Sequence, residues 1–238
     1  MPTWGSILAE LARPENLLPN GQRDHDKVRR KYLAALYQKT GRPVIAYASA
    51  FLEKPGSPGD LAIELGDLQG FMNAVAEIED RNLDLIITSP GGSAEATESI
   101  VAYLRTRFDH IRAFIPVAAM SAATMLALGC DEIVMGAHSQ LGPIDPQFTL
   151  STPDGPRAAP GQAILDQFEK AKEELRNPQN IGAWLPILRA YMPGLLAMCE
   201  DQQELAKRMV REWLEQYMLR GDAERASKAQ AAANWFAN

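Results

Sequence analysis

Residues 83–93, LDLIITSPGGS, join a short apolar run of strand character directly to a Pro-Gly-Gly turn. A second junction follows at residues 111–125, where IRAFI leads through PVAAM into SAATM. Segments with helical periodicity separate these apolar runs, and strands that alternate with ten- to fifteen-residue helices are typical of parallel βα units. The sequence therefore predicts an α/β fold built on a parallel sheet.

The same patterns predict elements on both sides of these junctions. Apolar runs of strand length predict further strands at residues 43–48 and 132–135, and apolar residues spaced three and four apart predict helices at 24–39, 67–79 and 94–107. A loop is expected at 53–60, and an irregular segment at 139–161, which holds five prolines and three glycines. Only helices are expected beyond it, at 162–176, 181–219 with breaks near Pro186 and Pro193, and 223–236.

We expect a single domain over residues 1–238. It would comprise an N-terminal helical arm (1–40), an α/β core (41–160) and a C-terminal helical region (161–238). A chain of 238 residues of which 46% are hydrophobic can bury a core of that size.

Composition excludes several classes of protein. The net charge of −6 and the scattering of Lys and Arg among acidic residues argue against a nucleic-acid partner. Cys130 and Cys199 lie far apart in apolar segments, as reduced core thiols do, and are not spaced as metal ligands. No stretch reaches the roughly 18 to 20 apolar residues that span a bilayer, and the start lacks a signal-peptide pattern. A soluble cytoplasmic protein with no membrane partner is predicted.

Gly91, Gly92 and Ser121 carry the chemistry that the two junctions allow. Glycines let backbone N–H groups face a ligand with no Cβ in the way, as an oxyanion hole requires. Ser121 would begin a helix whose first N–H groups favour a developing negative charge. Each motif alone also has an ordinary structural explanation, because Pro-Gly-Gly is a common turn and serine caps many helices. Together they indicate an acyl-transfer site.

Several stretches resemble a known family. They are TSPGG at 88–92, AMSAATM at 119–125, and DEIVMG with LGPIDPQ at 131–136 and 141–147. They are similar to motifs of the serine dehydrogenase proteinases, within the superfamily of Clp proteases, signal-peptide peptidases and crotonases. The resemblance runs from near Arg42 into the C-terminal helices. It implies a ClpP/crotonase-like ββα spiral and a serine endopeptidase that acts on a protein or peptide substrate.

The resemblance also implies a role for each residue of the site. Ser121 would be the nucleophile that forms an acyl-enzyme. The oxyanion would accept hydrogen bonds from the N–H of Gly91 or Gly92 and from the N–H of Ala122. Neither a cofactor nor a metal ion is expected.

A histidine base is not evident in the sequence. Clp proteases place a histidine in the strand after the nucleophilic helix, and the corresponding residues 142–145 contain none. His138 is near in sequence, but its Ala-His-Ser setting favours a solvated loop. His25 and His110 stand in charged, surface-like segments.

A lysine is the alternative base. Signal-peptide-peptidase relatives use a lysine some fifty residues after the serine, and Lys172 stands at that distance from Ser121. Lys170 is the second choice. A lysine base must be neutral, which requires burial or a cationic neighbour. Glu169 and Glu174 stand at helical spacing from these lysines and instead indicate solvated ion pairs.

Two carboxylates are further candidates. Asp145 stands in the most family-like stretch, where it would orient a base or bind substrate backbone, although Asp before proline also forms turns. Asp67 heads a helix and is expected to be its N-cap rather than a site residue. The chain stops at residues 234–238 within a helical segment. Relatives continue with a histidine-containing segment, which would be another source of a base.

Two other functions stay open. A member without a base would be a catalytically silent scaffold or regulator of an active partner. Crotonase-type enzymes use the same glycine-lined oxyanion hole on acyl-CoA substrates, but they need no serine nucleophile.

Self-association is expected in each case, as a trimer-based or larger homo-oligomeric ring. Its interface candidates are apolar residues of the C-terminal region, which would otherwise be intramolecular core: Trp184, Leu185, Leu188, Met192, Leu195 and Leu196.

Overall fold

The computed structural model describes residues 3–52, 61–152 and 155–237. Its centre is a four-stranded parallel sheet in the order β1-β2-β3-β5. These strands are β1 (Val44–Ala48), β2 (Asn82–Thr88), β3 (His110–Ile115) and β5 (Glu132–Met135). All four occur where the sequence predicts them, whereas the loop predicted at 53–60 lies outside the described residues.

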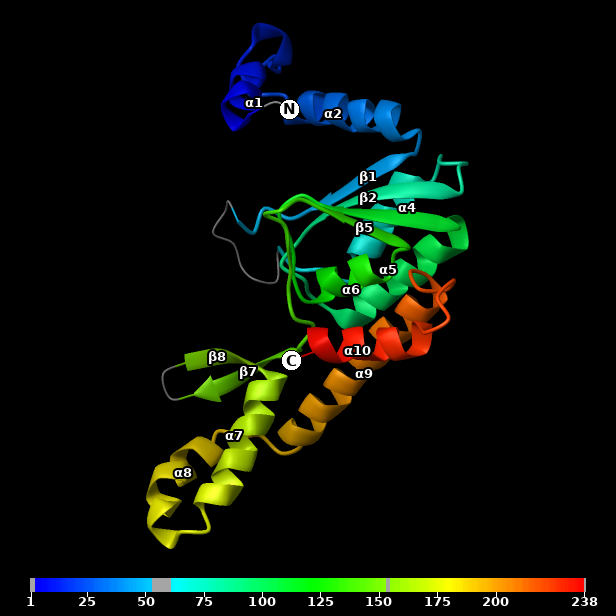
Figure 1. The fold of residues 1–238 in the computed structure, drawn as a ribbon. Coiled ribbons are helices and arrows are strands. Elements are labelled where there is room, and N and C mark those ends of the chain that lie inside the picture. Colours follow the sequence, from blue (N-terminus) through cyan, green and yellow to red (C-terminus); the bar gives the residue numbers. More distant parts are fainter. Residues whose placement is uncertain (1–2, 53–60, 153–154, 238) are drawn as a thin grey trace.

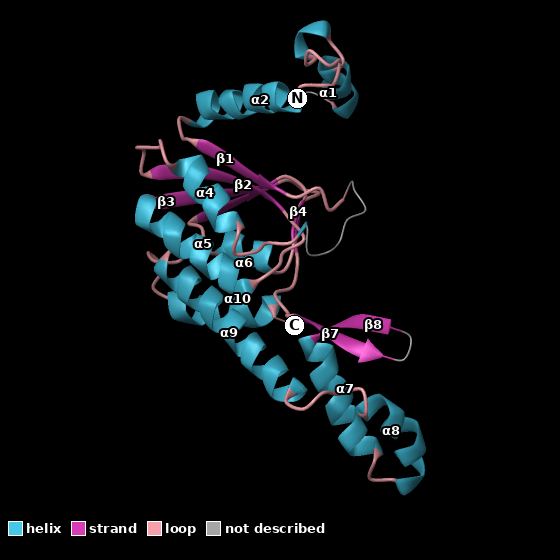
Figure 2. Ribbon diagram, turned by 180° about the vertical axis from the view of Figure 1, so that it is seen from behind, coloured by secondary structure: helices cyan, strands magenta, loops and turns pink. Residues whose placement is uncertain are grey.

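One face of the sheet is covered by helices (Figures 1 and 2). They are α4 (Asp67–Val75), α5 (Ala94–Arg107), α6 (Ala122–Leu128), α9 (Leu195–Gln216) and α10 (Arg225–Phe236). Leu83, Leu85 and Ile87 of β2 alternate along the strand, so they point to this one face and are fully buried under the helices. The parallel sheet and its helical layer thus enclose the main hydrophobic core.

A second, two-stranded sheet lies beside the end of β2. β4 (Ala118–Ala119) pairs in parallel with β6 (Gln140–Leu141). Ser89, just past β2, bridges to Ala119 of β4. The ends of β2 and β4, where the two sequence motifs stand, are therefore adjacent in space.

The segment 139–161 is not irregular throughout, and that prediction is wrong. It contains β6 and an antiparallel hairpin of β7 (Gln147–Thr152) and β8 (Gly155–Pro160). Prolines interrupt ladders inside a sheet but are tolerated on edge strands. Both strands of a two-stranded hairpin are edges, so Pro156 and Pro160 fit β8.

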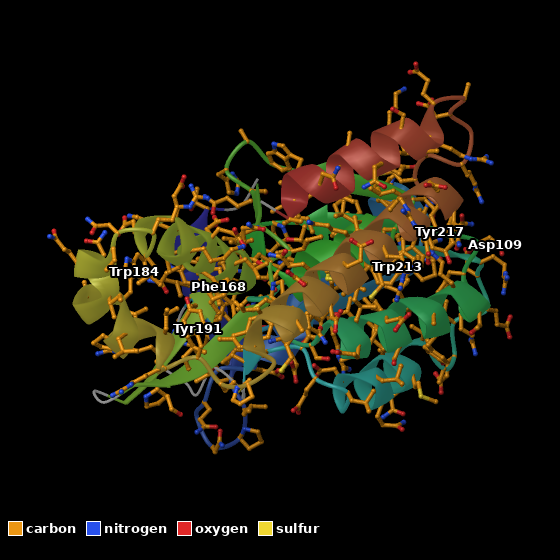
Figure 3. The ribbon with its side chains drawn as sticks, turned by 90° about the horizontal axis from the view of Figure 1, so that it is seen from below. Asp109, Phe168, Trp184, Tyr191, Trp213 and Tyr217 are labelled. Carbon is orange, nitrogen blue, oxygen red and sulfur yellow. The ribbon has the colours of Figure 1, made fainter. Side chains whose placement is uncertain are left out.

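The hairpin packs with a helical arm that projects from the core (Figure 1). The arm consists of α7 (Gly161–Glu174), η2 (Pro178–Asn180), α8 (Ile181–Leu188) and the residues that lead from α8 into the first turns of α9. Its small core is formed by Ile164, Leu195 and Cys199, with Phe148 and Leu150 from the hairpin. Figure 3 shows Phe168, Tyr191 and Trp184 in this arm, whereas Trp213 and Tyr217 lie at the opposite end.

Only one of the two predicted helix breaks occurs. Pro186 lies inside α8, which continues to Leu188. The break near Pro193 is confirmed, because Gly194 adopts a φ of 80° immediately before α9.

The N-terminal helices lie apart from the helical layer, beside β1 (Figure 1). They are α1 (Trp4–Leu11), η1 (Pro14–Asn16) and α2 (His25–Thr40). The Asp24 side chain caps α2 by accepting from the Lys27 N–H, and Gly41 ends the helix in the left-handed conformation. This confirms the helix predicted at 24–39.

Within the described residues, no helix combines the length and apolarity needed to cross a membrane. The same residues hold no cluster of three or more His, Cys, Asp or Glu side chains suited to a metal ion.

Candidate active site

Ser121 occupies a strained turn between β4 and α6. Its φ of 49° and ψ of −123° lie where L-residues rarely fold, and it is the one non-glycine residue with a positive φ in the described chain. It stands at the N-cap position of α6, yet its side chain makes no capping hydrogen bond. The ordinary helix-cap interpretation of Ser121 therefore does not hold, and its hydroxyl is left for another use.

Pro90, Gly91 and Gly92, which we call the glycine loop, lie directly against this turn. A Cβ on Gly91 would come within 2.4 Å of the Met120 carbonyl oxygen and 2.6 Å of the Ser121 Cβ. Gly91 also has a φ of 96°, which side-chain-bearing residues avoid. The loop can approach Ser121 so closely only because position 91 has no side chain.

Ile63 holds the glycine loop from the other side. Its N–H donates to the Gly91 carbonyl at 2.7 Å, and its carbonyl accepts from the Ser93 N–H at 2.9 Å. A Cβ on Gly92 would lie 2.3 Å from backbone atoms of Ile63. Both glycines therefore meet backbone at distances that no side chain tolerates.

The hydrogen bonds of the loop distinguish its two glycines. The Gly91 N–H donates to the Ser89 Oγ at 3.1 Å and is already engaged. The N–H groups of Gly92 and Ala122 have no acceptor among the described residues. Gly92 and Ala122 are thus the better candidates for the two donors of an oxyanion hole, and Gly91 is a packing residue.

A cleft of about 640 Å³ opens beside Ser121. Its wall combines the glycine loop, the start of α5, Met125 of α6, the stretch around Ile144 and the middle of α9. Most of the lining is apolar, and its polar side chains are Ser93, Glu95, Ser121, Gln147 and Gln202. A cleft with this lining suits a peptide whose side chains are mainly apolar.

Gln147 and Gln202 line the cleft, but neither was predicted as a cleft residue from the sequence. Gln202 stands on α9, which reaches the cleft only through the tertiary fold. No local signal in the sequence marks this residue.

Among the described lining residues, Glu95 is the one titratable side chain. It is exposed in the first turn of α5 and accepts a hydrogen bond from the Ser93 hydroxyl at 2.9 Å. No histidine or lysine lines the described part of the cleft.

The structure does not bring Lys172 to the lining of the cleft. Its ammonium group is exposed on α7 and donates to both carboxylate oxygens of Glu169, at 2.7 and 2.8 Å. Lys170 is exposed and lies 3.9 Å from Glu174. Both lysines have the solvated ion-pair setting that their spacing from glutamates indicated, and neither has the burial that would make a lysine a base.

Asp145 has contacts unlike those of a residue that orients a base. Its buried carboxylate accepts from the Gln203 side chain at 2.9 Å and from the Gln162 N–H at 3.2 Å. These bonds tie the stretch after β6 to the start of α7 and to α9. Its neighbours Ile144 and Pro146 line the cleft, whereas Asp145 does not.

The three histidines lie outside the cleft lining. His138 is exposed in the turn after β5, as predicted, and His25 is exposed at the start of α2. His110 is half-buried between Arg42 and Glu132.

Asp67 is not the N-cap of α4, and that expectation is wrong. Gly66 holds the N-cap position without a side-chain bond, and Asp67 is the first helical residue. Its carboxylate instead accepts from the Tyr47 hydroxyl and from the Glu64 N–H.

Ser121 thus stands at a strained turn next to the glycine loop, with the N–H groups of Gly92 and Ala122 free in the described chain, and the sequence decides the family. The family model of ClpP-like SDH-type serine proteinases matches residues 23–177. The chain belongs to this family. The ClpP/crotonase-like α/β class expected from the motifs is thereby confirmed, and the match spans the sheet, Ser121 and α7 of the chain.

Two curated relatives are uncharacterized proteins of Methanocaldococcus jannaschii. One is 38% identical over 96 residues and the other 37% identical over 94. The matches cover 40% and 39% of this chain, and 32% and 33% of the relatives. The chain thus spans about a third of the curated relatives that it matches.

Solved structures of proteases are also similar in part. A membrane-bound stomatin-specific protease matches with 21% identity and a TM-score of 0.36, over 45% of this chain and 54% of that one. The ClpP catalytic domain of Plasmodium falciparum matches with 14% identity and a TM-score of 0.31, over 42% and 51% of the two chains. These likenesses are too partial to carry any of the argument.

Proposed function

We propose that this protein is a serine endopeptidase that hydrolyses peptide bonds through an acyl-enzyme on Ser121. The observation that carries the proposal is the strained position of Ser121, whose hydroxyl caps no helix and stands beside the free N–H groups of Gly92 and Ala122. Family membership supports the reaction class.

The reaction would run in two stages. Ser121 Oγ adds to the scissile carbonyl as its proton passes to a base, and the N–H groups of Gly92 and Ala122 donate to the oxyanion. The C–N bond then breaks and the amine leaves with a proton. Water hydrolyses the resulting ester and restores the serine.

The substrate would be a protein or peptide segment with apolar side chains. Phe51, Leu61, Met125 and Ile144 line the cleft, and Glu95 supplies one carboxylate near the start of α5. An extended chain in this cleft would place one carbonyl at the two free N–H groups.

The proposal assigns no general base, because the described lining holds neither histidine nor lysine. Lys172 and Asp145 stay hypotheses for the roles of base and orienting carboxylate. For Lys172 that role requires the arm to move or a second copy of the chain to supply it. The same observation supports a second candidate function, a catalytically silent member that binds peptides for an active partner.

A crotonase-type reaction on acyl-CoA has less support. Such enzymes do not need a strained serine. They use carboxylates close to the reacting thioester. In the described lining the one carboxylate, Glu95, is exposed and bonded to Ser93.

We propose a cytoplasmic homo-oligomer. The six interface residues expected from the sequence differ in exposure, with Leu188 and Leu196 half-buried. Trp184 and Leu195 are buried within the arm, whereas Leu185 and Met192 are 45% and 46% exposed. The exposed pair on the arm is the better candidate for contact with another copy.

Treatment with a fluorophosphonate, followed by mass mapping of the adduct, tests the proposed function. This probe phosphonylates an activated serine, so a single adduct at Ser121 is the expected result. Peptide binding without any adduct would favour the silent scaffold. An adduct on another serine, retained in Ser121→Ala, would refute the assignment of the nucleophile.

A further inference from the structure

Asp67 stands at the start of α4, outside the cleft lining, yet its carboxylate holds two groups that lead to the glycine loop. Oδ2 accepts from the Tyr47 hydroxyl at 2.9 Å and from the Glu64 N–H at 3.0 Å. Each of these donors begins a separate path to the loop.

The first path runs through Tyr47 and Ser89. Tyr47 pairs with Ile87 across β1 and β2, so Ser89 is the next residue beyond β2 on the same face. Ser89 is fully buried, and its hydroxyl lies close enough to the Tyr47 phenol to oppose part of the rise in the pKa of that phenol. The Ser89 Oγ in turn accepts the Gly91 N–H at 3.1 Å.

The second path runs through the backbone next to Glu64. Ile63 precedes it and pairs with the glycine loop on both sides of Gly92, donating to the Gly91 carbonyl and accepting from the Ser93 N–H. Holding the Glu64 N–H therefore fixes the segment that presses on Gly92, where a Cβ would meet Ile63 at 2.3 Å.

Tyr47 is suited to act as a permanent donor in this arrangement. Burial, and next the hydrogen bond to Asp67, raise the pKa of the Tyr47 phenol above its usual value. The phenol keeps its proton at neutral and moderately alkaline pH. Its ring stacks on Phe71 with the centroids 5.3 Å apart, so the side chain has its own packing support.

We propose that Asp67 and Tyr47 are positioning residues that hold the glycine loop in the conformation that directs the Gly92 N–H at the oxyanion. The carboxylate fixes the Glu64 N–H and with it Ile63, which is hydrogen-bonded to the loop. It also fixes the Tyr47 hydroxyl, which lies near Ser89, the residue whose Oγ accepts the Gly91 N–H. Engaging the Gly91 N–H leaves that of Gly92 as the free donor. This inference rests on the proposed serine-hydrolase function.

Tyr47→Phe is the sharpest variant, because it removes the hydroxyl and keeps the ring that stacks on Phe71. Tyr191→Phe is its matched control, since the Tyr191 hydroxyl also donates to a side chain, Gln167 at 2.8 Å, but in the helical arm. Asp67→Ala removes both acceptor bonds, and Asp67→Asn keeps an oxygen acceptor and should restore most of the lost function.

Two measurements on the full chain decide the question. In Tyr47→Phe and Asp67→Ala, the rate of fluorophosphonate labelling at Ser121 should fall by about tenfold, as expected for misplacing one oxyanion donor. The affinity for a bound peptide should stay within about twofold, because only the transition state uses the Gly92 N–H. Amide hydrogen exchange at Gly91 should accelerate in Tyr47→Phe, while the Leu85 amide in the sheet and the whole Tyr191→Phe chain keep wild-type rates.

The possible failures are distinct. No labelling of the wild-type chain would refute the proposed function, and the inference with it. Normal labelling of wild type together with unchanged labelling in Tyr47→Phe would overturn the inference alone. Equal losses of peptide affinity and labelling rate in Tyr47→Phe would also overturn the inference, because Tyr47 would then be a general structural residue. An unchanged rate of amide exchange at Gly91 in Tyr47→Phe would overturn it as well.

Discussion

A Cβ on Gly91 would lie only 2.6 Å from the Cβ of Ser121, so the glycine loop and the turn at Ser121 are in direct contact. Each motif alone is common in proteins, but this contact makes them one site. A change at position 91 therefore acts on Ser121 directly.

Ser121→Ala should lower peptidase or esterase turnover by several orders of magnitude, because it removes the attacking atom. The fold should survive, since the hydroxyl caps no helix. Turnover and the melting temperature are the measurements. Undiminished turnover in a folded variant would contradict Ser121 as the nucleophile.

Gly91→Ala should lower turnover by about a hundredfold or more and reduce stability, because the new methyl group would meet Met120, Ser121 and Ala122 at 2.4 to 2.9 Å. Gly182→Ala in α8 is the matched control, since a Cβ there meets no atom within 4 Å. The control should be as active as wild type. Gly92→Ala should be damaging too, through the Ile63 backbone. Full activity of folded Gly91→Ala would leave the loop as a plain turn.

Thr124→Val should destabilise the chain by about 1–3 kcal/mol, because it removes the hydrogen bonds of a fully buried hydroxyl. The Thr124 hydroxyl is fully buried below Ser121 and bonds to the Ala119 carbonyl at 2.7 Å and to the Gly142 N–H at 3.1 Å. Denaturant unfolding measures the loss. Thr124→Ser keeps the hydroxyl and should recover most of it, and equal losses in both variants would contradict this account.

Lys172→Ala and Lys170→Ala should both leave activity unchanged across pH, because both ammonium groups are exposed and paired with glutamates. Turnover from pH 6 to 10 checks this. A loss confined to Lys172→Ala, growing at the alkaline end, would instead support the lysine base and require the arm or a second copy to bring Lys172 to Ser121.

Cys130 should resist alkylation in the native chain at pH 8 and react only on unfolding. Burial raises the pKa of its thiol from 9.0 to about 12, so the folded chain keeps the thiol neutral. The contribution of this group to stability is complete below pH 9 and declines as the pH rises toward 12. Timed alkylation with peptide mapping checks the first claim. Rapid labelling of native Cys130 would contradict its burial.

Local pattern was sufficient to predict much of this molecule. The apolar runs at 43–48 and between residues 83 and 135 predicted every strand of the main sheet. The glycine pair and Ser121 were found from backbone chemistry and family motifs. The hairpin at 147–160 was missed because its prolines argue against a strand until the strand is known to be an edge. Gln202 and the bonds of Asp67 could not be predicted, because they depend on where α9 and β1 lie in the folded chain.

Helix α9 belongs to both hydrophobic clusters. Leu195 and Cys199 at its start are part of the arm, and Val210 and Leu214 near its end are part of the main core. Gln202 and Ala206, between them, form a wall of the cleft. Because α9 is one continuous helix, a displacement of its first turns together with the arm would carry Gln202 and Ala206 with it and so change the shape of the cleft.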